Sequence, residues 1–288
     1  MFYLLSMLTG VLIALTIAIN GVLTEHYGAY SASVIIHMVG LTVIILIVLF
    51  KRISPFSSRH PWYLYLGGAI GVATVIFINM AFGRISVSAI LALGLLGQSV
   101  TGLFFDQYGW LGMQKHPFRR GKLIGLAFIL AGIAVMITGF EIVAVVLAFA
   151  SGIAIVIART FNARLSEQTN AYTSTLFNNI VGLSVSFLAL FLLGRNELAA
   201  GFVIYPNWWI YMGGVVGVGI ITLSNVTVVK VSALYLSLLV FIGQVFMGLV
   251  VDMVIDQEFS LLILIGGALV TLGLVVNLLQ DKKNIIQV

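Results

Sequence analysis

The sequence contains no cysteine and very little charge, and both absences limit what the protein can be. Without cysteine there is no disulfide and no cysteine-ligated metal site. Only 8% of the 288 residues are charged and 61% are hydrophobic, whereas a soluble domain carries about 25% charged residues. So few charges cannot cover a surface that faces water. We therefore expect an integral membrane protein, with lipid as its main solvent.

Patterns typical of enzymes and metal sites are also missing from the sequence. The four histidines are scattered, and no cluster of His, Asp or Glu has the spacing of metal ligands. There is no nucleophile elbow and no phosphate-binding glycine loop ahead of a helix. We expect neither an enzyme nor a cofactor or metal. The net charge of +5 lies mostly in loops, where it indicates membrane orientation rather than a nucleic-acid-binding surface.

Ten stretches are long and apolar enough to cross a bilayer, which takes roughly 20 mostly apolar residues. Their connections are short, and none of them has room for a soluble domain. The start of the chain lacks the positive segment of a cleavable signal peptide, so the first span is expected to stay in the mature protein. The predicted spans are residues 4–24, 30–50, 63–83, 86–106, 121–140, 141–163, 171–193, 209–228, 231–252 and 260–279.

The second half of the chain repeats the first. The segment GQSVTGLFFD at residues 97–106 recurs 146 residues later as GQVFMGLVVD at residues 243–252. In the first two spans of each half, equivalent residues are 142 positions apart, as Asn20 and Asn162 are. A match of this length indicates a duplication. The fold class expected is therefore an all-α membrane protein in which residues 1–140 and 141–288 form five-helix repeats of one domain. Because five is odd, the second repeat must be inverted in the membrane.

Many glycines have the small-xxx-small spacing that lets membrane helices approach closely. Helix packing is the first interpretation of these residues. Four of them offer an alternative, because they could mark breaks in helices next to a substrate. These four are Gly68, Gly97, Gly214 and Gly243.

Lysine and arginine lie mostly on one side of the predicted bilayer. If the termini are on side A, that side receives twelve of them and the other side receives only Arg84 and Arg195. The positive-inside rule makes side A cytoplasmic. Arg159 and Arg164 are expected near the cytoplasmic end of their helix, where a long side chain reaches the interface at low cost.

Several of these segments resemble the signature of the YdcZ-like branch of the drug/metabolite transporter superfamily. The resemblance rests on residues 97–98 with 106–112, on Pro61-Trp62 followed by Gly67, Gly68 and Gly71, and on the spacing from Gly10 to Asn20. It covers nearly the whole chain and implies the fused ten-helix form of that family, in the bacterial inner membrane. The second half departs from the signature, since Asn207 replaces the proline before Trp208 and Asp252 lacks the aromatic tail. The resemblance implies transport and favours export.

Polar residues deep in the predicted spans come in pairs related by the repeat. Such residues are costly in lipid and usually face the bundle interior. Amides both donate and accept hydrogen bonds, which suits a neutral or zwitterionic solute. The structural alternative is that they bond neighbouring helices. The predicted substrate-binding residues are Asn20 with Asn162, His37 with Asn179, Asn79 with Asn225, and Gln98 with Gln244.

Two further predictions concern coupling and gating. A histidine titrates near neutral pH, so His37 could couple a proton to transport, or it could be a neutral ring bonded to a carbonyl. Asp106 and Asp252 end matching helices on opposite sides of the membrane. Each could pair with an arginine and latch a gate, or could be only a solvated helix end. No acidic residue lies deep in a predicted span, which argues against a carboxylate that exchanges protons for a cation.

The function predicted is an inner-membrane secondary transporter that moves a small organic solute, a metabolite or a drug, by alternating access. An uncoupled channel or facilitator, a lipid-headgroup flippase and a non-transporting sensor or scaffold stay open as alternatives. The expected partners are the bilayer and a small-molecule substrate, with proton coupling possible and no nucleic acid. The chain is expected to be a monomer or a homodimer with both termini in the cytoplasm.

Overall fold

The structure is a computed structural model that describes residues 2–55, 60–108, 122–136, 141–201, 203–227, 233–255 and 261–285. These residues form ten long helices, a short helix α8 (Arg195–Ala199) and the 3-10 turns η1 (Trp62–Tyr65) and η3 (Trp208–Met212), with no strand in the described ranges. The long helices are α1 (Phe2–Tyr27), α2 (Ala29–Phe50), α3 (Leu66–Ala81), α4 (Val87–Tyr108), α5 (Lys122–Met136), α6 (Ile142–Gln168), α7 (Ala171–Leu193), α9 (Gly213–Thr227), α10 (Ala233–Ile255) and α11 (Leu261–Ile285).

Each long helix coincides with one predicted span. Six helical segments are long and apolar enough to cross a membrane, namely α1, α2, η1 with α3, α6, α7 and η3 with α9. The other four helices, α4, α5, α10 and α11, contain shorter apolar stretches of 10–17 residues. The prediction of an all-α membrane protein is therefore confirmed. The main difference lies in length, since α6 and α11 continue several residues past the ends of the predicted spans 141–163 and 260–279.

Local sequence explains how the short connections reverse the chain. Gly28 joins α1 to α2 with a φ of 84°, which glycine adopts without steric penalty. Asn170 precedes α7, and its Oδ1 accepts a hydrogen bond of 2.9 Å from the backbone N–H of Thr173. An asparagine in this N-cap position satisfies a donor that the first helical turn leaves free.

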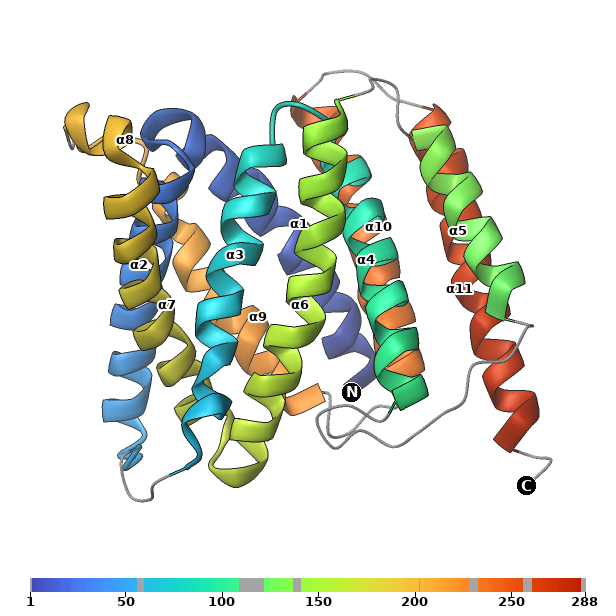
Figure 1. The fold of residues 1–288 in the computed structure, drawn as a ribbon, viewed down its shortest axis with the longest axis horizontal. Helices are drawn as coiled ribbons and strands as arrows, with labels where there is room; N and C mark the ends of the chain where they lie inside the picture. Colours follow the sequence, from blue (N-terminus) through green and yellow to red (C-terminus); the bar gives the residue numbers. More distant parts are fainter. Residues whose placement is uncertain are drawn as a thin grey trace.

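The helices of the two halves pack mainly against each other. The most extensive contacts join α5 to α11, α1 to α10, α3 to α6, α2 to α7 and α4 to α6. In Figure 1, α1 starts near the lower edge of the view and α6 starts near the upper edge, so these two helices run in opposite directions. The first turn of α1 and the last turn of α11 both lie towards the lower edge (Figure 1).

Glycines allow these helices to touch through their backbones. A Cβ on Gly97 of α4 would overlap the carbonyl oxygen of Phe149, and one on Gly243 of α10 would overlap that of Met7. These two contacts correspond to each other through the repeat. Because α4 and α10 continue without interruption through Gly97 and Gly243, the interpretation of these two glycines as helix breaks is wrong. They act instead in helix packing.

Alanine in place of Gly97 should destabilise the protein, because the added Cβ must push α4 away from α6. Overpacking of this kind costs about 1–3 kcal/mol, which a lowered melting temperature of the detergent-purified protein would report. Gly102 is a control on the same helix, since a Cβ there meets nothing within 4 Å. Gly102→Ala should leave the melting temperature unchanged or raise it. Equal effects of the two changes would contradict the packing argument.

Candidate functional site

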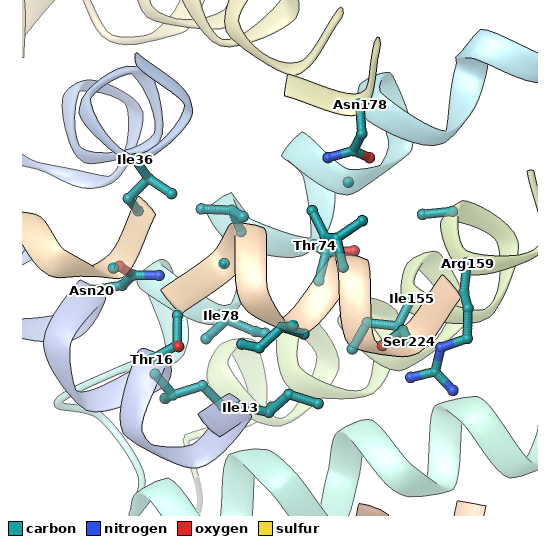
Figure 2. A pocket seen from close by; sticks show the side chains of 18 of the residues that line it. Ile13, Thr16, Asn20, Ile36, Thr74, Ile78, Ile155, Arg159, Asn178 and Ser224 are labelled. Atoms are coloured by element: carbon teal, nitrogen blue, oxygen red, sulfur yellow. The ribbon is translucent and has the colours of Figure 1, made fainter. Parts of the chain in front are cut away.

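A cavity of about 230 Å³ lies between α1, α2 and α3 of the first half and α6, α7 and α9 of the second, with Gln98 of α4 and Gln244 of α10 at its wall. Figure 2 shows side chains from several of these helices converging on it. Most of its lining is apolar, with amides and hydroxyls between the isoleucines. A mostly apolar pocket with a few placed polar groups is typical of a small-molecule site.

The lining residues of the cavity correspond through the repeat. With the exception of Gly213 and Gly214, the equivalent of each lining residue in the other half also lines the cavity. The pairs are Ile13/Ile155, Thr16/Ala158, Ile17/Arg159, Asn20/Asn162, Ile36/Asn178, His37/Asn179, Gly71/Gly217, Thr74/Ile220, Val75/Ile221, Ile78/Ser224, Asn79/Asn225 and Gln98/Gln244. The cavity therefore lies where equivalent surfaces of the two halves face each other.

All eight residues predicted from the sequence as substrate-binding line this cavity. Seven of them are buried, and Gln98 is partly buried. They come from α1, α2, α3, α4, α6, α7, α9 and α10, so helices distant in sequence bring them together. Contact with a substrate stays a prediction for each of them.

Asn178 is a lining residue that the sequence analysis missed. Its Oδ1 accepts a hydrogen bond of 2.9 Å from Nδ2 of Asn162, which links α7 to α6. The repeat offered no signal for it, because the equivalent position in the first half is Ile36. Its position next to the predicted Asn179 was the one available hint. For the Asn162–Asn178 pair, the structural role of bonding neighbouring helices holds.

Three other amide atoms in the cavity wall have no such partner. Oδ1 of Asn20, Nδ2 of Asn79 and Nδ2 of Asn225 are buried without a hydrogen bond to any described residue. An unsatisfied buried polar group costs about 1–3 kcal/mol, and native structures keep few of them. Asn79 and Asn225 are equivalent through the repeat and both line the cavity, so each half has one such buried donor among its lining residues.

His37 lies between α2 and α7. Its Nδ1 is 2.8 Å from the carbonyl oxygen of Ser33 and 3.3 Å from Oγ of Ser186. Since a carbonyl oxygen only accepts, Nδ1 must carry the proton, and Nε2 is the acceptor when the ring is neutral. This geometry fits a neutral ring bonded to a carbonyl. That arrangement is the alternative to proton coupling that the sequence leaves open.

Arg159 departs from its predicted position. The sequence predicts a position near the cytoplasmic end of its helix, but α6 continues to Gln168, about 13.5 Å further along the axis at 1.5 Å per residue. Its side chain instead lines the cavity, and Figure 2 draws it among the other lining residues. Arg164, one turn beyond, is near the helix end as predicted and pairs with Glu167 at 2.8 Å.

Of the two predicted gate residues, Asp252 does not belong to the described lining of the cavity. Asp252 accepts hydrogen bonds of 2.8 and 3.0 Å from the backbone N–H groups of Val87 and Ser88, at the start of α4. It is 4% exposed, so the alternative of a solvated helix end is wrong for this residue. A carboxylate at a helix N-terminus satisfies free donors and interacts well with the helix dipole. The side chain of Asp106 lies outside the described residues.

Alanine in place of Asp252 should lower the stability of the protein by about 1–2 kcal/mol, the typical cost of losing a helix N-cap. Asparagine should cost less, because its amide oxygen can still accept one of the two N–H groups. Thermal unfolding of the purified variants measures this order. A variant Asp252→Ala that is as stable as the parent would show that the contact with α4 contributes nothing.

A match to a sequence profile identifies the family to which this chain belongs. The sequence profile described as "Putative inner membrane exporter, YdcZ" matches residues 1–135 and 143–276, while no curated protein matches the chain. A solved structure named only "Crystal structure of protein" is similar in fold, with a TM-score of 0.65 and 18% identity over 98% of this chain and 96% of that one. At this identity the likeness concerns the fold alone. The chain belongs to the YdcZ family of the drug/metabolite transporter superfamily, a family of inner-membrane exporters.

Proposed function

We propose that the protein is a secondary transporter that carries a small organic solute across the inner membrane by alternating access. The observation that supports this most is the cavity between the two halves, walled by equivalent residues from each. A binding site at the interface of two repeats is typical of secondary transporters. The family adds the expectation of export.

In this proposal all ten long helices cross the membrane as two inverted five-helix repeats, residues 1–140 and 141–288. The opposite directions of α1 and α6 (Figure 1), the two segments matched by the family and the one-sided distribution of lysine and arginine support it. Both termini are then cytoplasmic. Because one chain supplies both repeats, a monomer is sufficient for function and a homodimer is not required.

Alternating access requires that each half can adopt the packing that the other half has, and equivalent helix contacts between the halves would allow this. Gly10 of α1 packs on the carbonyl of Val240, and Gly152 of α6 packs on that of Gly94. The repeat relates these two contacts. Rocking of one half against the other would loosen one contact and tighten the other, and so would open the cavity alternately to each side. Asp106 and Asp252, on equivalent helices, are the proposed gate residues.

The proposed substrate-binding residues are the eight predicted ones together with Asn178. A cavity of about 230 Å³ is smaller than the roughly 300–1,000 Å³ of sites for drug-sized ligands. The size favours a metabolite over a drug. The unpaired atoms of Asn20, Asn79 and Asn225 are the groups that we expect to bond the solute directly.

Counterflow in proteoliposomes tests this function. Liposomes loaded with unlabelled solute should accumulate the labelled solute transiently and with saturation, because a carrier exchanges its cargo one molecule at a time. Candidate solutes come from thermal-shift screening of metabolites on the purified protein. Flux without saturation or counterflow would indicate the channel alternative, and binding without flux would indicate a sensor.

His37 has the geometry of a neutral ring in this structure, and proton coupling would require it to take up a proton during the transport cycle. In the variant His37→Asn, both equivalent positions carry asparagine, since Asn179 is its partner in the repeat. Asparagine cannot take up a proton in this range, so the acceleration of transport by a pH gradient should disappear while exchange without a gradient remains. Full dependence on the gradient in this variant would remove His37 from the coupling mechanism.

A further inference from the structure

The two sides of the cavity differ in charge although they are related by the repeat. Three lining pairs place a polar group on the second half and an isoleucine on the first. These pairs are Arg159 with Ile17, Asn178 with Ile36, and Ser224 with Ile78. Thr16 and Thr74 differ from their partners in the opposite sense, but neither carries a charge. A solute in this cavity therefore meets a charged side chain on the second half and none with a permanent charge on the first.

Arg159 places a positive charge in the cavity, and no described lining residue balances it. Arg159 is the one lining side chain with a permanent charge, and no Asp or Glu belongs to the lining that the structure describes. Within the described ranges, no ion pair or hydrogen bond holds its guanidinium group. A charge inside a membrane protein is costly and usually finds a partner. Arg159 is therefore available to a negatively charged ligand.

We propose that the transported solute is a small organic monoanion whose carboxylate binds Arg159, with its apolar part towards Ile17, Ile36 and Ile78. This inference rests on the transport function proposed above. The planar guanidinium group binds a carboxylate through two parallel hydrogen bonds. The second half also contributes the amide of Asn178 and the hydroxyl of Ser224, two neutral hydrogen-bonding groups, to the lining.

The amount of charge distinguishes a carboxylate from other anions. One guanidinium group neutralises one negative charge, whereas a phosphate monoester carries about −1.5 to −2 at neutral pH and would leave charge uncompensated in the cavity. A permanently charged cation would be repelled by Arg159. On the first half, Ile17, Ile36 and Ile78 favour contact with an apolar substituent over contact with a second charged group.

Ligand binding to matched acids and amides tests the proposal on the full-length protein. The probes are hexanoate, benzoate and phenylacetate, each compared with its primary amide, and thermal unfolding in detergent gives the apparent affinity. We expect the carboxylates to stabilise the parent protein more than the amides do. Arg159→Gln should weaken carboxylate binding about 10–100-fold, and Arg159→Lys should weaken it less. The control is Arg164→Gln, which removes a charge from the same helix outside the cavity and should leave binding unchanged.

The proposal that a carboxylate binds Arg159 fails if no carboxylate binds the parent protein better than its amide does. It also fails if Arg159→Gln binds carboxylates as tightly as the parent does. The ligand-free variant Arg159→Gln should be at least as stable as the parent, because an unpaired charge is removed. A large loss of stability would indicate a structural partner for Arg159 and would also overturn the proposal.

The same variants in the counterflow assay separate this inference from the transport function. Counterflow of amides or other uncharged solutes, unaffected by Arg159→Gln, would overturn the anion proposal and leave transport intact. If neither acids nor uncharged solutes show flux, the proposed transport function itself fails. Carboxylate counterflow that Arg159→Gln abolishes and Arg164→Gln preserves would support both.

Discussion

Phenylalanine in place of Gly217 is expected to reduce transport to the level of empty liposomes while the protein still folds. Gly217 lines the cavity, and a Cβ at this position meets nothing within 4 Å. The ring can therefore enter the cavity without displacing the backbone of a neighbouring helix. A cavity of about 230 Å³ has little room for both a phenyl ring and a solute. Counterflow in proteoliposomes measures the loss, and size-exclusion chromatography measures folding.

The same helix offers a matched control for Gly217→Phe. Gly219 also has open space around its Cβ position, but it does not belong to the cavity lining. Gly219→Phe should therefore fold and retain transport. If Gly217→Phe retains the transport rate of the parent, the solute does not pass through this cavity. If both variants lose transport equally, the effect belongs to α9 as a whole and not to the cavity.

Leucine in place of an asparagine should change stability in opposite directions at Asn79 and at Asn162. Nδ2 of Asn79 is buried without a partner among the described residues, so Asn79→Leu should leave the ligand-free protein as stable as the parent or more stable. Asn162 donates to Asn178, so Asn162→Leu leaves a buried acceptor unpaired and should cost about 1–3 kcal/mol. Thermal unfolding in detergent gives both values.

Transport separates the two roles further. Asn79→Leu should lose transport even though it is stable, because we propose that the solute bonds Nδ2 of Asn79. Asn225→Leu, the equivalent change in the second half, should behave like Asn79→Leu, since Nδ2 of Asn225 is also unpaired. Substantial loss of stability in Asn79→Leu would show that Asn79 has a structural role, and unchanged transport would remove it from the proposed site.

The sequence predicted the helical elements well because hydrophobic length is a strong signal in a membrane protein. Every predicted span corresponds to one long helix, and the all-α membrane fold is confirmed. The repeat also selected the amide and histidine pairs, from Asn20 to Gln244, that line one cavity. This selection worked because polar residues deep in an apolar span are costly and face the interior. Their role in binding stays a prediction.

The residues that sequence analysis misplaced are those that break the repeat or depend on a distant partner. Asn178 was missed because its equivalent is Ile36, and Arg159 was assigned to a helix end because the length of α6 was underestimated. Asp252 was weighed as a gate or a solvated end, but its partners are backbone N–H groups of α4. Backbone donors leave no trace in sequence, so no pattern could have identified them.

The sequence by itself determined that the chain lies in a membrane, that it is helical and that its halves are equivalent, because composition, hydrophobic length and duplication are properties of the chain. Only the tertiary structure decided which polar groups are paired and which are free. That depends on contacts between helices far apart in sequence, such as Asn162 with Asn178. Only the packing of the two halves around a common cavity shows that the guanidinium of Arg159 and three amide atoms of the cavity wall have no partner among the described residues.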